Sequence, residues 1–172
     1  SKTLAGDGST ILKVYYTRNS YELTLAKDAN VASTTGADTY KYEEPVTINA
    51  ELESDVGYTY EFTKWASSNI TLLADKADQE ATFYMPAGAV TLTATASKTA
   101  QDVQYTVEFY KQANGEYPAE PTSTDTRTAK TGTTAEVTSN DKTPDVGYAY
   151  DTAATNVESA TVAGNGSTVL KV

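Results

Sequence analysis

Residues 90–97, VTLTATAS, alternate apolar and polar side chains throughout. Val90, Leu92 and Ala94 fall on one side of an extended chain, and the intervening threonines fall on the other. Because successive side chains of a β-strand point to opposite faces of its sheet, this pattern predicts a strand with one buried face and one solvated face.

The same alternation recurs outward from this stretch. The further strands predicted in this way are residues 21–27, 40–52, 58–66, 81–86 and 105–111, with weaker candidates near 124–130, 133–138 and 156–163. Pro45 marks a strand start or an edge, because proline cannot donate a hydrogen bond to a neighbouring strand. A short helix is expected only at residues 72–81. The predicted fold class is therefore mainly β, within the α+β class.

Composition limits the classes of function open to the chain. It has 172 residues, a net charge of −10, no cysteine and no histidine. The acidic balance would repel nucleic acid and anionic membranes. No apolar run approaches the roughly 20 residues that cross a bilayer. We therefore expect no membrane insertion, and we expect any export or anchoring signal to lie outside these residues.

Two internal repeats indicate how the chain is organised. SKTLAGDGSTILKV (1–14) and SATVAGNGSTVLKV (159–172) are identical at ten of fourteen positions, and DVGYTY (55–60) recurs as DVGYAY (145–150). The first pair lies 158 residues apart, which predicts a longer array with that period. The second pair predicts that the two halves of the chain are distant copies of one module.

These repeats predict three segments. Residues 1–19 are expected to be the closing strand of a preceding copy, residues 20–98 a first module, and residues 103–172 a second module that lacks the end of its last strand. Residues 9–17 would then be a strand without a sheet of its own, and such a strand exposes backbone hydrogen-bonding groups. We expect it to add to, or to replace part of, the sheet of a second module in a neighbouring molecule, which gives a head-to-tail association.

Several stretches resemble repeat modules of Gram-positive surface proteins. GYTYEFTKW (57–65) and ATFYMPAGAVTLTA (81–94) are similar to the divergent internalin-B-type repeat, while YTVEFYKQANGEY (105–117) and NGSTVLKV (165–172) resemble mucin-binding-protein-like modules. The signature positions are Gly57, Tyr58, Phe62, Trp65, Met85, Pro86 and Val90, with Gly147 and Tyr148 in the second DVGY motif. The resemblance implies two tandem β-grasp-like (ubiquitin-like) modules in an elongated arrangement, in a protein of the bacterial cell surface or a secreted protein.

Enzyme activity is not expected. Without histidine and cysteine, the commonest general base, the thiolate nucleophile and the soft metal ligands are missing. The carboxylate pairs at residues 43–44 and 51–53 are interpreted as solvated strand faces, because a glycosidase dyad needs a cleft and split pKa values. Asp-Gly and Asn-Gly at residues 7–8 and 165–166 predict hairpin turns. We predict no catalytic residue, cofactor or metal site, and leave adventitious calcium open at residues 139–145.

The sequence thus predicts a non-catalytic tandem-repeat stalk or adhesion segment, whose partners are adjacent repeats and a host glycan or protein. The alternative is a carbohydrate-binding module for mucin-type glycans. Exposed aromatic side chains separate the two, because a glycan site needs two or more coplanar rings in a shared groove. Trp65 is expected in the core, since a buried aromatic side chain supplies much of the apolar burial of a small module.

Overall fold

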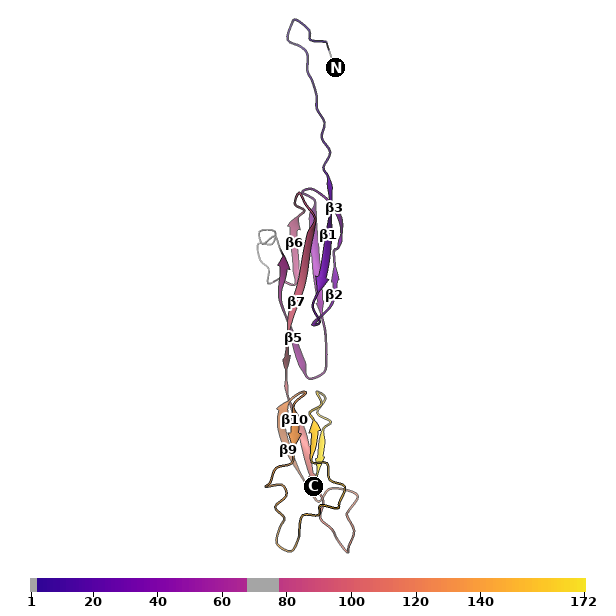
Figure 1. Ribbon diagram of the computed structural model, residues 1–172, viewed down its shortest axis with the longest axis vertical. Helices are drawn as coiled ribbons and strands as arrows, with labels where there is room; N and C mark the ends of the chain where they lie inside the picture. Colours follow the sequence, from indigo (N-terminus) through magenta and orange to yellow (C-terminus); the bar gives the residue numbers. More distant parts are fainter. Residues whose placement is uncertain (1–2, 68–77) are drawn as a thin grey trace. The chain divides into compact units, whose positions relative to one another are not determined.

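The computed structural model describes residues 3–67 and 78–172, and within them it contains strands and turns but no helix (Figure 1). The strands are β1 (Ser20–Lys27), β2 (Val31–Thr35), β3 (Asp38–Lys41), β4 (Pro45–Leu52), β5 (Tyr58–Ser67), β6 (Glu80–Tyr84), β7 (Val90–Ala100), β8 (Asp102–Phe109), β9 (Ser123–Lys130), β10 (Thr134–Glu136), β11 (Ser159–Thr161) and β12 (Val169–Lys171). The described part of the chain therefore has no helix that is long and apolar enough to cross a membrane.

The chain divides into two compact units. The first comprises residues 1–51 and 64–95, and the second comprises residues 52–63 and 96–172. The turn between β4 and β5 thus belongs to the second unit, although its residues lie in the first half of the sequence.

The strands of the first half of the chain form two sheets, with strand orders β3-β1-β7-β5 and β2-β4-β6. β1 pairs with β7 in parallel, so that Leu23 lies beside Val90 and Leu25 beside Leu92. β1 pairs with β3 on its other side in the antiparallel direction. The first and last strands of this half are therefore neighbours in the middle of a mixed sheet.

Alternation buries one face of each of these sheets, as the sequence pattern predicts. The largest fully buried side chains of the first half are Leu23, Val31, Val46, Ile48, Trp65, Met85 and Leu92. Burying a side chain of this size contributes roughly 1.5–3 kcal/mol, so these residues form the core that holds the two sheets together. Pro45 begins β4, which confirms its predicted place at a strand start.

The second unit contains a three-stranded sheet, β12-β8-β9, and a two-stranded pair, β10-β11. β8 is the central strand, antiparallel to β9 and parallel to β12. Its alternating side chains form one cluster with the neighbouring strands, and that core consists of Tyr105, Val107, Ala135, Val162 and Leu170.

Each half of the chain contains an equivalent pair of backbone hydrogen bonds between a turn and a later segment. Glu43 N–H donates to Met85 O at 2.8 Å, and Met85 N–H donates back to the residue after Glu43 at 3.0 Å. In the same way, Gly132 N–H donates to Val162 O at 2.8 Å, and Val162 N–H donates back to the residue after Gly132 at 2.8 Å. Glu43 and Gly132 both have positive φ, 60° and 80°, so the two turns are equivalent in conformation.

Two features of the structure differ from the sequence expectations. The α+β assignment is not supported, because the described residues contain no helix; most of the helix expected at residues 72–81 lies outside them, and Glu80 already begins β6 by pairing with Asn49. Residues 9–17 pair with no strand in the described part of their own chain, and their expected pairing with another molecule stays a prediction. β2 and β3 were not predicted as separate strands, because five and four residues are too few to establish a two-residue period.

Candidate functional site

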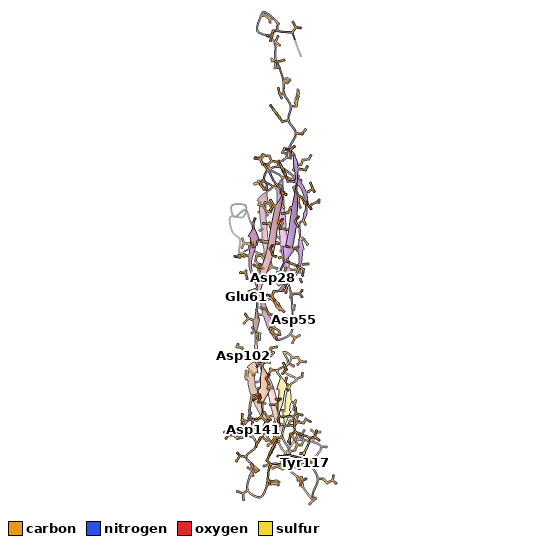
Figure 2. All side chains as sticks on the ribbon, viewed as in Figure 1. Asp28, Asp55, Glu61, Asp102, Tyr117 and Asp141 are labelled. Atoms are coloured by element: carbon orange, nitrogen blue, oxygen red, sulfur yellow. The ribbon has the colours of Figure 1, made fainter. Side chains whose placement is uncertain are left out.

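A cleft of about 1160 Å³ is lined by the loops that follow β8 and precede β11. These loops lie at one end of the second unit (Figure 1). Its lining includes four tyrosines, Tyr110, Tyr117, Tyr148 and Tyr150. Figure 2 shows Tyr117 among these loops. Tyr117 and Tyr148 are 41% and 48% exposed, so their side chains remain accessible to a ligand. The cleft therefore supplies the shared groove and several aromatic side chains of the glycan hypothesis.

Carboxylates hold the hydroxyl groups of these tyrosines. Tyr150 donates to Glu158 Oε1 at 2.5 Å, and Tyr117 donates to Asp151 Oδ2 at 2.9 Å. The hydrogen bond to Glu158 raises the pKa of Tyr150 to about 12, and the hydrogen bond to Asp151 raises the pKa of Tyr117. Both phenols stay protonated at neutral pH, and each hydroxyl group is held by a carboxylate.

Lysines lie over the faces of three of the four tyrosine rings, and one of them is Lys171, whose Nζ is 5.5 Å from the ring centroid of Tyr110. Lys111 Nζ is 5.7 Å from the ring centroid of Tyr148 and forms an ion pair with Asp145, whose hydrogen bond raises the pKa of Lys111. Lys142 Nζ is 5.5 Å from the ring centroid of Tyr150. Exposed ion pairs of this kind contribute little to stability, so their main effect is to orient the side chains of the cleft.

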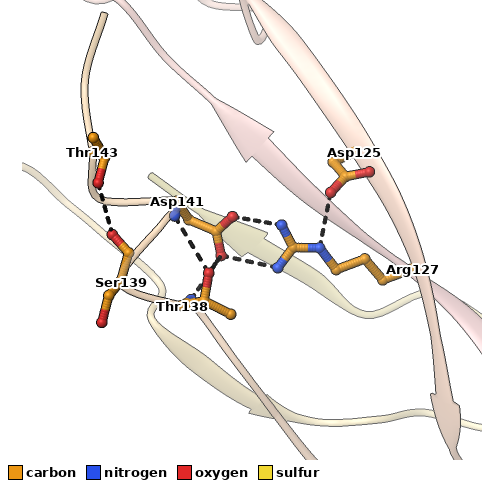
Figure 3. A network of polar contacts seen from close by, with 6 residues as sticks. All are labelled: Asp125, Arg127, Thr138, Ser139, Asp141 and Thr143. Atoms are coloured by element: carbon orange, nitrogen blue, oxygen red, sulfur yellow. Dashed lines mark hydrogen bonds and ion pairs between the residues drawn. The ribbon is translucent and has the colours of Figure 1, made fainter.

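Arg127 ties the loop after β10 to β9 (Figure 3). Its Nη1 and Nη2 donate to the two oxygens of Asp141 at 2.9 Å and 2.5 Å, and its Nε donates to Asp125 at 2.9 Å. Asp141 Oδ2 also accepts from the backbone N–H and the hydroxyl of Thr138. The hydrogen bonds from Arg127 hold the pKa of Asp141 well below its usual range, against the effect of burial. This carboxylate of residues 139–145 is thus already engaged by a cation.

The two DVGY motifs fold into the same turn. Tyr58 N–H donates to Asp55 O at 3.1 Å, and Tyr148 N–H donates to Asp145 O at 3.0 Å. The third residue of each turn is a glycine with φ of 84° or 93°, a region that other residues adopt only with strain. The second of these turns forms part of the cleft.

A lysine fastens the first DVGY turn. Lys98 Nζ lies 2.6 Å from Asp55 Oδ2, and 4.1 Å and 5.3 Å from the ring centroids of Tyr58 and Tyr60. The hydroxyl of Tyr60 donates to the same oxygen of Asp55 at 2.5 Å. The hydrogen bond from Lys98, followed by that from Tyr60, lowers the pKa of Asp55. In the second turn, Lys111 of the β8–β9 connection takes the corresponding role.

The two turns differ in their surroundings. Gly57 O accepts a hydrogen bond from Gln101 N–H at 2.8 Å, and a Cβ on Gly57 would lie only 2.4 Å from Gly164 Cα. A Cβ on Gly147 would meet nothing within 4 Å, and Val146 is fully exposed. The first turn is therefore packed against other residues of the second unit, whereas the tip of the second turn is open.

The remaining signature positions lie within the first half. Trp65 is fully buried, and its Nε1 donates to Gln79 O at 3.3 Å, which places it in the core as expected. Phe62 and Pro86 are half-buried.

Sequence reasoning did not identify the cleft. Tyr148 was singled out through the DVGY repeat, but nothing local brings it together with Tyr117. The signal that was present is the spacing of Tyr148 and Tyr150, which matches that of Tyr58 and Tyr60.

The strand pattern of the first half can be compared with known families. Residues 21–100 match the divergent InlB B-repeat domain. The matched residues begin within β1 and end with β7, and they contain both the first DVGY turn and the buried Trp65. No curated protein and no solved structure matches the chain.

Proposed function

We propose that the chain is a non-catalytic tandem-repeat segment of a bacterial surface protein, with a stalk or adhesion role outside the cell. The main support is that residues 159–172, which include β11 and β12 and close the sheet of the second unit, recur as residues 1–14. An array of copies would contain such a segment once in every 158 residues. The InlB B-repeat at residues 21–100 supports the setting of a surface-protein repeat.

In this proposal both halves are β-grasp-like (ubiquitin-like) modules. The parallel pairing of β1 with β7, and of β8 with β12, supports it. So do the shared hydrogen bonds at Glu43 and Gly132. The second half is the module that resembles the mucin-binding-protein-like repeats of Gram-positive bacteria. Repeats that contact only their neighbours can be extended into long stalks, because each added copy repeats the same contacts.

A chain of two copies tests the proposal. Residues 1–172 followed directly by residues 15–172 reproduce the predicted period, because Val172 then takes the place of Val14. Small-angle scattering should give a radius of gyration that rises strongly from one copy to two. A value near the roughly 20 Å of a compact chain of about 330 residues would contradict an extended array.

The tyrosine-lined cleft favours a second function, glycan binding. Tyr117 and Tyr148 are partly exposed, and Asp151 and Lys111 place charged groups beside them. Aromatic side chains combined with a few polar groups are a common way to orient a polar ligand in a pocket.

A glycan array tests this second function when the chain is displayed in several copies, because single sites of this kind gain strength through avidity. Tyr117→Ala and Tyr148→Ala should each abolish binding, while Tyr84→Ala, at an exposed position on β6, should leave it intact. Equal binding by all three variants would exclude the cleft as the glycan site.

A further inference from the structure

We propose that residues 5–18 of one copy dock into the second unit of another copy, where they replace residues 163–172 and extend into the tyrosine-lined cleft. The inference rests on the proposed repeat organisation, in which residues 15–18 follow a copy of residues 163–172 directly, so the docked segment reproduces the junction between two copies.

Residues 5–10 already hold the conformation that their counterparts adopt in the folded second unit. Ala5 N–H donates to Thr10 Oγ1 at 2.7 Å, as Ala163 N–H donates to Thr168 Oγ1 at 2.8 Å. The positive-φ glycine of each turn has φ of 75° in the first copy and 74° in the second. Because the turn is preorganised, docking it costs less conformational entropy.

The apolar side chains of this segment are exposed, whereas those of its copy are buried. Leu12 is 67% exposed, and its counterpart Leu170 is 0% exposed in the core of the second unit. The other largely exposed apolar side chains of the segment are Ile11, Val14, Tyr15 and Tyr16. The segment can therefore supply to another molecule the contacts that residues 163–172 make within their own chain.

Leu170 and Leu92 occupy the same place in the sheets of the two halves. Leu170 pairs with Val107 of β8, and Leu92 pairs with Leu25 of β1, both in parallel. A docked Leu12 would take this place as well, because it is the copy of Leu170. Residues beyond Leu12 can then be compared with those beyond Leu92.

This comparison gives Arg18 a partner. Arg18 lies six residues beyond Leu12, as Lys98 lies six residues beyond Leu92. Lys98 forms its ion pair with Asp55 of the first DVGY turn. The equivalent aspartate of the second turn is Asp145, which lines the cleft. A docked Arg18 is therefore expected to reach Asp145 of the other copy.

By the same count, Tyr16 corresponds to Ala96, which is buried in β7. Tyr16 is 90% exposed, and the cleft offers room for its ring beside the tyrosines of the second unit. Arg18 now donates from Nη1 to Tyr42 O at 3.0 Å. A guanidinium has five N–H donors, so Arg18 can keep this bond while it contacts Asp145.

Lys111 pairs with Asp145 in the single chain. A carboxylate has about four lone-pair sites, so it can accept from a lysine and from an arginine together. The contacts of the displaced residues 163–172 are restored by the docked segment, and those of residues 15–18 are added. Each copy offers a segment and a cleft at different places, so the contact is heterologous and builds head-to-tail chains.

Sedimentation of the full chain tests the proposal. The protein is first warmed to just below its unfolding temperature, because residues 163–172 must detach before the segment of another copy can replace them. The average mass should rise with concentration, and hydrogen exchange at residues 9–18 should slow in parallel. Leu12→Lys should weaken the association at least tenfold, while Tyr84→Lys, also at an exposed apolar position, should leave it unchanged.

A charge exchange makes the test specific. Arg18→Glu and Asp145→Lys should each weaken association, and the double variant carrying both changes should regain it. A monomer up to millimolar concentration, association that Leu12→Lys does not weaken, or glycan binding in the cleft without self-association would each overturn the proposal. The two-copy chain can still give an extended particle in these cases, so failure here is distinguishable from failure of the repeat proposal.

Discussion

Gly57 and Gly164 lie in direct contact within the second unit. A Cβ on Gly164 would be 2.0 Å from Val56 O and 2.9 Å from Gly57 Cα. Such an approach is open only to residues without a side chain, so the DVGY turn and the AGNG turn meet backbone to backbone. Gly6 is the copy of Gly164 in the first fourteen residues, and a Cβ there would meet nothing within 4 Å.

The first prediction uses this pair of equivalent glycines. Gly164→Ala should lower the free energy of unfolding of the second unit by about 1–3 kcal/mol, because the added methyl group forces two backbones apart. Gly6→Ala should change it by less than about 0.5 kcal/mol. Calorimetry measures both variants. Equal unfolding temperatures for Gly164→Ala and the unchanged chain would contradict the close contact between Gly57 and Gly164.

Trp65→Ala should destabilise the first unit by about 3–5 kcal/mol, because a fully buried large aromatic side chain leaves a cavity. Far-UV circular dichroism during heating should then show two transitions, with the earlier one belonging to the first unit. Tyr84→Ala, at a side chain that is 70% exposed, serves as the control and should shift stability by no more than about 0.5 kcal/mol. An unshifted first transition in Trp65→Ala would place the indole outside the core.

Asp141→Asn should make the second unit less stable at neutral pH by about 1.5–3 kcal/mol, since it weakens charged hydrogen bonds to Arg127. The pKa of Asp141 is lowered in the folded state, so its contribution is complete above the unfolded-state pKa of about 4 and is lost as the pH falls below that value.

Denaturant unfolding from pH 7 to pH 2 measures this difference, and the gap between the two proteins should narrow below about pH 4. Asp125→Asn is the matched control, because this carboxylate is 52% exposed and receives one bond from Arg127. Its effect should stay below about 1 kcal/mol. A gap for Asp141→Asn that is constant with pH would contradict the ion pair.

The hydrogen bond to Glu158 raises the pKa of Tyr150 to about 12. Tyr150→Phe should therefore remove one titration step near pH 12. The stability from this bond is present below the ordinary tyrosine pKa of about 10 and is lost as the pH rises through the folded-state value. Absorbance at an ultraviolet wavelength specific for tyrosinate follows the titration. Tyr148→Phe should leave the titration step near pH 12 in place. If the step disappeared in Tyr148→Phe, it would not belong to Tyr150.

Local sequence patterns are sufficient to place most of the strands. Residues 21–27 and 90–97 alternate over enough positions for a two-residue period to be read, and they form β1 and β7. Pro45 begins β4, and the repeated DVGY motif forms the same turn twice. These features depend on neighbours along the chain, because side-chain direction, proline geometry and positive φ at glycine are local properties.

The contacts between these elements could not be predicted from local patterns, because they form only in the folded chain. Arg127 and Asp141 are fourteen residues apart, and Tyr117 and Tyr148 thirty-one, with no pattern in the sequence that links them. The central place of β8 between β9 and β12 likewise depends on the packing of the core around Val107. Such pairings are set by the burial of apolar faces over long sequence separations, where many partners satisfy the same local pattern and only the packed core selects one.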